Sequence, residues 1–177
     1  CGRDASTLTS RLVSKRRAAV AARIDAMTAK SDEISSVEWV TRMMFQGWLG
    51  VAIWMAIGLL LETLMAYKAP SYLDDAQRRE LFRLAHAHGT LLHLILLLAA
   101  LCGGSAHLKL PRAARIGLRF GAVMMPVGFF LAGLWHSEGD PGLFIWLVPV
   151  GAALLIFGMV VAAIASYRTR KESARRR

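Results

Sequence analysis

Four long apolar segments, separated by short polar stretches, limit the folds that are open to this chain. They run over about residues 43–67, 84–103, 116–135 and 143–167. A helix needs about 20 mostly apolar residues to cross the hydrocarbon layer of a bilayer, and each segment meets that length. Hydrophobic residues also make up 55% of the chain, which is more than an ordinary soluble domain contains. The sequence therefore predicts an all-α integral membrane protein that forms a four-helix transmembrane bundle.

The polar ends of the chain divide it into three regions. Residues 1–42 form a basic N-terminal arm, residues 43–167 hold the four spans, and residues 168–177 form a basic C-terminal tail. Glycines in the first, third and fourth spans permit close contact between helices. The first residue is Cys rather than Met, so we expect the numbered chain to be processed or incomplete at its start.

The arm has the periodicity of a helix between Thr7 and Lys30. Its larger apolar residues fall on one side and basic residues occupy much of the remainder; the apolar ones are Leu12, Val13, Val20, Ile24 and Met27. This pattern predicts an amphipathic surface helix that lies on a membrane or packs on a partner. A solvated helical arm is the simpler alternative. The polar residues 31–33 interrupt the pattern, so we expect the helix to break there.

The positions of Lys and Arg predict the orientation in the membrane. These residues dominate the arm, the loop over residues 105–115 and the tail, whereas the turn over residues 136–142 has none. Cytoplasmic segments carry the excess of Lys and Arg, so both termini are expected to be cytoplasmic. The loop over residues 68–83 does not fit, because it is placed outside and yet carries Lys68 and three arginines. We expect those arginines, Arg78, Arg79 and Arg83, to be held by acids of the outer turn or by a partner.

The net charge of +10 flanks the apolar segments, which is where anionic lipid head groups lie. The expected partners are therefore anionic lipid and other membrane protein subunits, and not nucleic acid. The residues expected to make these contacts are Lys15, Arg16, Arg17, Arg23, Arg168, Arg170, Lys171, Arg175, Arg176 and Arg177.

The second apolar segment carries three of the five histidines. His86 and His93 are seven residues apart, so they share one helical face with Thr90 between them. His93 lies about 12 Å beyond Ala85 at roughly 1.5 Å per residue, which is deep in the hydrocarbon layer. An imidazole at that depth needs a polar partner, and ionisable residues within a span are functional candidates.

The predicted orientation collects several polar residues in the outer half of the bundle. They are Glu62, His86, His88, His93, His136, Glu138 and Asp140. Imidazoles and carboxylates suit zinc, copper or iron, which predicts a metal site. A haem held by His86 or His93 together with His136 is a second possibility, and a proton relay is a third. The haem hypothesis has a weakness, because only His93 is deep. The simplest interpretation places the other histidines in water, with only His93 needing an internal hydrogen bond.

No phosphate-binding glycine loop, HExxH, CxxC or catalytic triad occurs in the sequence, and no catalytic residues are predicted. Little of the chain lies outside the membrane to carry out chemistry. The sequence therefore favours a small non-catalytic subunit of a larger membrane complex, located in a bacterial inner membrane. The alternative is a membrane redox protein that binds haem or a transition metal through the outer cluster.

Overall fold

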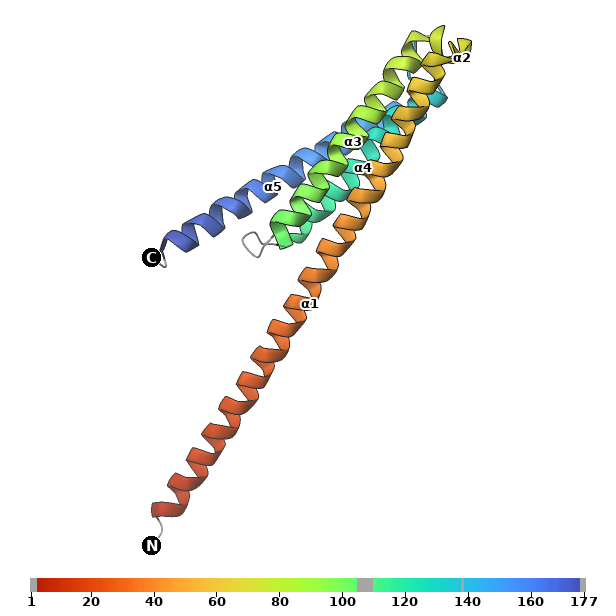
Figure 1. Ribbon diagram of the computed structural model, residues 1–177. Helices are drawn as coiled ribbons and strands as arrows, with labels where there is room; N and C mark the ends of the chain where they lie inside the picture. The colour runs from red at the N-terminus through yellow and green to blue at the C-terminus, as the bar shows by residue number, and fades with distance from the viewer. Residues whose placement is uncertain (1–2, 105–109, 138, 176–177) are drawn as a thin grey trace. The chain divides into compact units, whose positions relative to one another are not determined.

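The computed structural model describes residues 3–104, 110–137 and 139–175, which form helices joined by short turns (Figure 1). No β-strand occurs among them. In chain order the elements are α1 (Arg3–Ala66), α2 (Pro70–Leu73), α3 (Ala76–Gly104), α4 (Arg112–Leu134), the short 3-10 helix η1 (Leu143–Trp146) and α5 (Leu147–Arg175).

Four helical segments are long and apolar enough to cross a membrane, as predicted. They are Val37–Ala66, Ala76–Gly104, Arg112–Leu134 and Leu143–Lys171. Each extends past its predicted limits at one end or both, most clearly where the second span begins at Ala76 and the predicted span near residue 84. The hydrophobic pattern marks only the part of a helix that is apolar, whereas caps and packing fix where the helix starts.

The chain divides into two compact units, Cys1–Trp39 and Val40–Arg177, which are described separately. Helix α1 continues through residues 31–33, where the sequence suggested a break. Ser, Asp and Glu lower helix propensity by less than about 1 kcal/mol each, and the stretch has neither Gly nor Pro to end a helix. A polar stretch without a breaker therefore leaves the helix intact.

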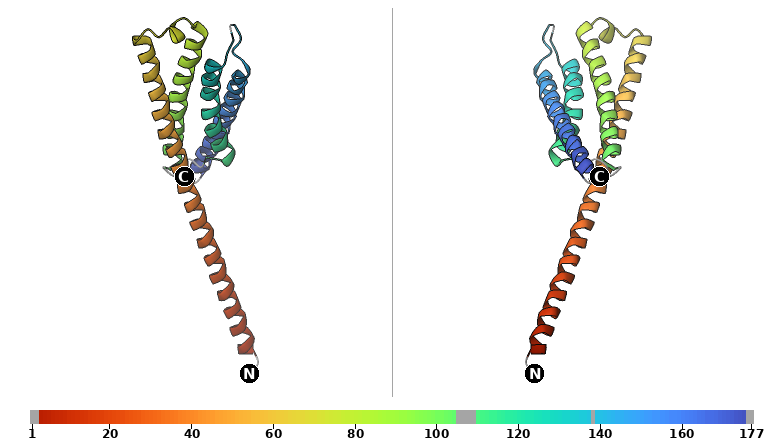
Figure 2. Two further views of the ribbon diagram at one scale, coloured as in Figure 1. Left: turned by 90° about the vertical axis from the view of Figure 1, so that its right-hand side faces the viewer. Right: turned by 90° about the vertical axis from the view of Figure 1, so that its left-hand side faces the viewer.

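In the second unit, long helices that follow one another in the chain run in opposite directions (Figure 2). Helix α1 from Val40 onward lies beside α3, helix α4 lies beside α5, and α3 also packs on α4. The turn around α2 and the turn before η1 meet at one end of the bundle, where His136 contacts Asp75. Under α2 a buried cluster of Leu61, Tyr72 and Phe82 joins these elements.

Glycines let the helices approach closely, as the sequence predicted. A Cβ atom at Gly47 would lie 2.6 Å from the side chain of Leu97 on α3. Between α4 and α5 the contact is with backbone: a Cβ atom at Gly117 would lie 2.7 Å from the carbonyl oxygen of Leu154. Both helix pairs therefore depend on the absence of a side chain at these positions.

Candidate functional site

The three histidines of α3 each bond a backbone carbonyl through Nδ1. His86 Nδ1 lies 2.7 Å from the Trp54 oxygen. His88 Nδ1 lies 2.9 Å from the Leu84 oxygen, and His93 Nδ1 lies 2.7 Å from the Gly89 oxygen. A carbonyl only accepts, so each Nδ1 carries the proton and donates it. In the neutral ring Nε2 is then an acceptor, and none of the three Nε2 atoms bonds another described residue.

His93 is the most buried of these side chains, at 3% exposure. Its ring lies against the backbone of α1 at Gly50, where an added Cβ atom would lie 1.8 Å from the ring carbon Cδ2. His86 packs on Gly58 in a similar way, because a Cβ atom added at Gly58 would lie 2.3 Å from the His86 Cε1 atom. The polar face of α3 thus packs on glycines of α1, which agrees with the interior position expected for His93.

His136 and Asp75 form a pair at the end of the bundle where the turn around α2 meets the turn before η1. His136 Nε2 lies 2.9 Å from Asp75 Oδ2, and the His136 side chain is only 5% exposed. Its Nδ1 is buried and has no partner among the described residues. The other Asp75 oxygen, Oδ1, accepts a 2.8 Å hydrogen bond from the Arg78 backbone N–H, which makes Asp75 the N-cap of α3. One carboxylate therefore starts α3 and anchors the turn after α4.

The hydrogen bond from the Arg78 backbone N–H holds the pKa of Asp75 below its ordinary value of 3.8. Burial opposes this shift, and the imidazole of His136 adds to it. Both favourable contacts stabilise the ionised carboxylate more than the neutral acid. The pair therefore depends on Asp75 remaining charged.

The sequence suggested that acids of the turn over residues 136–142, or a partner, hold the arginines of the loop over residues 68–83. In the described residues, Arg78 and Arg79 donate mainly to backbone carbonyls instead. Arg78 donates to the Gly133 oxygen at 3.2 Å and to the Ser71 oxygen at 3.0 Å, and it lies 3.7 Å from Asp75. Arg79 donates to the Leu73 oxygen. Arg83 lies 3.9 Å from Glu80, and both side chains are well exposed. Carbonyls at the ends of α2 and α4 are free of helical partners, which makes them ready acceptors.

The other residues of the predicted outer cluster do not converge. Glu62 is exposed and lines a pocket of about 420 Å³ with His86, but no hydrogen bond or ion pair joins them. Asp140 accepts a 2.8 Å bond from the Gly142 N–H, within its own turn. Glu138 lies outside the described residues. Among the residues that are described, no group of three or more His, Cys, Asp or Glu side chains is placed to hold a metal ion. The metal site and the haem site stay predictions.

The basic residues expected to meet lipid or a partner are exposed wherever their side chains are described. These are Arg16, Arg23, Arg168, Arg170, Lys171 and Arg175. The side chains of Lys15 and Arg17, and the whole of Arg176 and Arg177, lie outside the description. Exposure fits the predicted contacts but does not identify the surface that they meet.

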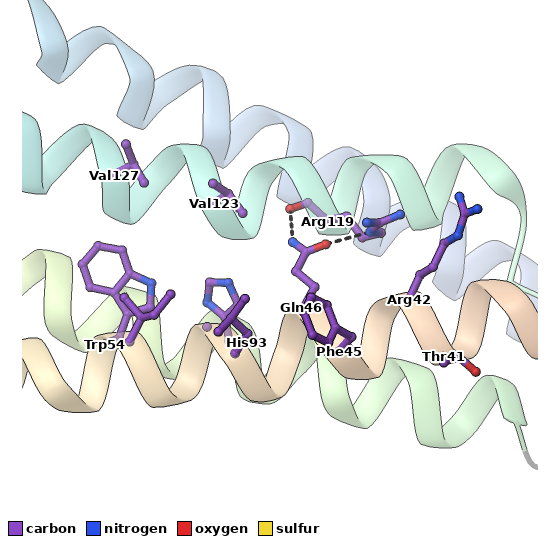
Figure 3. Close-up of a pocket in the computed structure, with 12 residues that line it drawn as sticks. Thr41, Arg42, Phe45, Gln46, Trp54, His93, Arg119, Val123 and Val127 are labelled. Carbon is purple, nitrogen blue, oxygen red and sulfur yellow. Dashed lines mark hydrogen bonds between the residues drawn. The ribbon is translucent and has the colours of Figure 1, made fainter.

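Sequence reasoning missed a groove between α1 and α4 with a volume of about 650 Å³ (Figure 3). His93 and Trp54 line it and are almost fully buried. Toward the N-terminal end of α4, Arg119 Nε donates to Gln46 Oε1 at 2.7 Å, and Gln46 Nε2 donates to the Arg119 oxygen at 2.9 Å. The available signal was that Gln46 and Arg119 are polar residues inside predicted apolar spans.

Comparisons with protein-family models, with curated proteins and with solved structures gave no match.

Two variants separate the two roles of Asp75, which caps α3 and pairs with His136. Asp75→Asn keeps a good N-cap but loses the charge that faces His136, whereas Asp75→Ala loses both. We expect Asp75→Ala to lower the free energy of unfolding by about 1 kcal/mol more than Asp75→Asn, which is the usual cost of losing a cap. Denaturation of the detergent-solubilised protein measures this difference.

The dependence on pH follows from the direction of the shift. Because the folded pKa of Asp75 lies below the unfolded one, its charge stabilises the fold fully above the ordinary value of 3.8. That contribution is lost as the pH falls through the lower, folded value. The stability gap between wild type and Asp75→Asn should therefore close below pH 3.8. A gap that widens on acidification would show that the charged carboxylate does not stabilise the fold.

Proposed function

We propose that the protein is a non-catalytic subunit of a larger membrane complex and that it docks through its N-terminal arm. One observation carries this proposal. Val20, Ile24 and Met27 are 58%, 55% and 70% exposed, although all three are large and apolar. They precede the candidate span that begins at Val37, so the hydrocarbon layer does not account for them. An exposed apolar stripe of this kind is typical of a contact surface.

The charge beside the stripe indicates the kind of partner. At about 100° per residue, Val20, Ile24 and Met27 fall within about 60° of one another around the helix. Arg16 and Arg23 fall beside Val20 on the same flank, and both are exposed. A partner helix with an apolar seam and acidic flanking residues would match this surface. We therefore propose an acidic amphipathic helix of another subunit as the partner.

A change on the stripe tests the docking role. In membranes from the native cells, solubilised in mild detergent, the tagged full chain should migrate in a complex heavier than itself. Ile24→Asp should release the free chain, because it places a charge in the apolar seam. Ala22→Asp is the matched control, since position 22 lies about 160° from Ile24 around the helix. Equal behaviour of the two variants would count against the stripe as the docking surface.

We also propose that both termini are cytoplasmic and that the turn before η1 faces outward, in a bacterial inner membrane. The support is the distribution of Lys and Arg. A membrane-impermeant thiol reagent applied to intact cells should label Ser137→Cys and spare Thr169→Cys, with Cys1 and Cys102 replaced by Ser in both. Labelling of Thr169→Cys alone would show that the orientation is the reverse of the one proposed.

A second function, haem or metal binding by the histidines of α3, has one observation in its favour. Histidines that bind metals commonly donate Nδ1–H to a carbonyl and present Nε2 to the metal, and both His86 and His93 donate in this way. An absorption spectrum and a metal analysis of the purified full chain test it. A Soret band or stoichiometric copper, zinc or iron that is lost in His93→Leu would support this function over the first.

A further inference from the structure

We propose that the groove between α1 and α4 binds one anionic phospholipid, with the phosphate on Arg119 and an acyl chain along the apolar walls. The proposal is independent of the docking role of the arm. It rests on the shape of the groove, on the nature of its walls and on the placement of one cation.

The groove has a buried floor and an exposed, apolar rim. His93 and Trp54 at the floor are 3% and 6% exposed, whereas Phe45, Leu49 and Ile53 on the rim of α1 are 69%, 47% and 48% exposed. Val123 and Val127 of α4 form the facing wall. The groove is therefore open along its side to whatever surrounds the bundle, and inside a membrane that is lipid.

Its length fits an acyl chain. The lining residues of α1 run from Thr41 to Trp54, which is about 20 Å at roughly 1.5 Å per residue. One leaflet of hydrocarbon is about half of a layer of about 30 Å. An acyl chain that enters at the Thr41 end can therefore lie in the groove over the full thickness of one leaflet. The volume of about 650 Å³ is also in the range of pockets that hold organic ligands.

The cation at one end of the groove favours a lipid with an anionic head group. Arg119 lies about 10 Å along α4 from Arg112, within the candidate span, at roughly 1.5 Å per residue. Its Nε is used by Gln46, which fixes the guanidinium, and no acid among the described residues pairs with it. A guanidinium at membrane depth without a counter-ion is costly, and its two terminal nitrogens match the oxygens of a phosphate. Arg42 lines the same end of the groove and adds positive charge (Figure 3).

A partner transmembrane helix is the competing occupant, and the charge argues against it. An apolar helix would leave Arg119 without a counter-ion, whereas an anionic phospholipid supplies both the chain and the phosphate. The leaflet is also the one expected to be cytoplasmic, where anionic lipids are concentrated. The lipid therefore accounts for both the walls and the end of the groove.

The test is native mass spectrometry of the full chain in mild detergent with equal amounts of phosphatidylglycerol and phosphatidylcholine of the same acyl chains. Wild type should retain one phosphatidylglycerol with a preference of about tenfold, because both lipids carry the phosphate but the choline ammonium of phosphatidylcholine cancels its net charge beside Arg119. Arg119→Gln should abolish the preference. Arg112→Gln is the matched control, because it removes the same charge from an exposed position of the same helix and should keep the preference.

A second variant covers a failure of Arg119→Gln to fold. Leu49→Trp fills the groove without changing the charge, and it should lower the retention of both lipids by a similar factor. Equal retention of the two lipids by wild type would overturn the proposal, as would equal losses in Arg119→Gln and Arg112→Gln. If Leu49→Cys cross-links to another protein and wild type retains no lipid, the groove is the binding site of a partner helix instead.

Discussion

Gly151→Ala should loosen the contact between α4 and α5 and lower the free energy of unfolding by about 1–3 kcal/mol, the usual cost of overpacking a close contact. The added Cβ atom would lie 2.7 Å from the Met125 nitrogen and 3.1 Å from the Met125 Cα atom. These are backbone atoms of α4, so no side-chain rotation relieves the clash and the two helices must separate. Unfolding of the detergent-solubilised protein measures the change.

Gly104→Ala is the matched control for this prediction. It makes the same chemical change, but the nearest atom to the new Cβ is Val40 Cγ1 at 3.6 Å, an ordinary van der Waals contact. Its effect should stay within about 0.5 kcal/mol, as for an unhindered surface substitution. Equal losses in the two variants would show that the backbone contact at Gly151 is not the cause.

His93→Ala should have the largest effect of any histidine substitution, about 2–4 kcal/mol, because it empties a buried site between α3 and α1. The hydrogen-bond partner of the ring is the Gly89 carbonyl, which lies within α3 itself, so the lost volume outweighs the lost bond. His93→Leu fills most of the space and should cost less than about 1.5 kcal/mol. If the imidazole also binds haem or a metal, His93→Leu will keep the fold and lose the ligand.

A double-mutant cycle of His93 and Gly50 tests whether the His93 ring packs on α1. Gly50→Ala alone should be destabilising, because the new Cβ atom would lie 1.8 Å from the His93 ring. In the His93→Ala background the ring is gone, and the same change should be neutral or stabilising. Additive effects of the two substitutions would mean that the ring does not pack on Gly50.

The sequence predicted the four spans because apolar length is a local property that hydropathy measures directly. It also predicted close contact between helices from the glycines within the spans, but it did not predict which helices form each pair. The contact between Asp75, which caps α3, and His136 was not predictable in this way. The pair joins residues that are distant in sequence.

The groove was missed for a related reason. Gln46 and Arg119 are 73 residues apart, and each is a single polar residue within an apolar segment. A mean hydropathy taken over a whole span gives little weight to one polar residue. The outer cluster was predicted from the level that each residue reaches in the membrane, but level alone does not fix the direction around a helix. His136 therefore pairs with Asp75, while no hydrogen bond or ion pair joins Glu62 or Asp140 to His136.

Photo-cross-linking at the arm tests the central claim, that the chain docks on another subunit, most directly. A photoreactive amino acid placed at Ile24 of the full chain in the native cells should give one defined adduct with another membrane protein. The same probe at Ala22, about 160° away on the helix, should not give that adduct. The partner segment recovered from the adduct should be a helix with an apolar seam and acidic flanks. Adducts with lipid alone at Ile24, or the same adduct at both positions, would contradict the account.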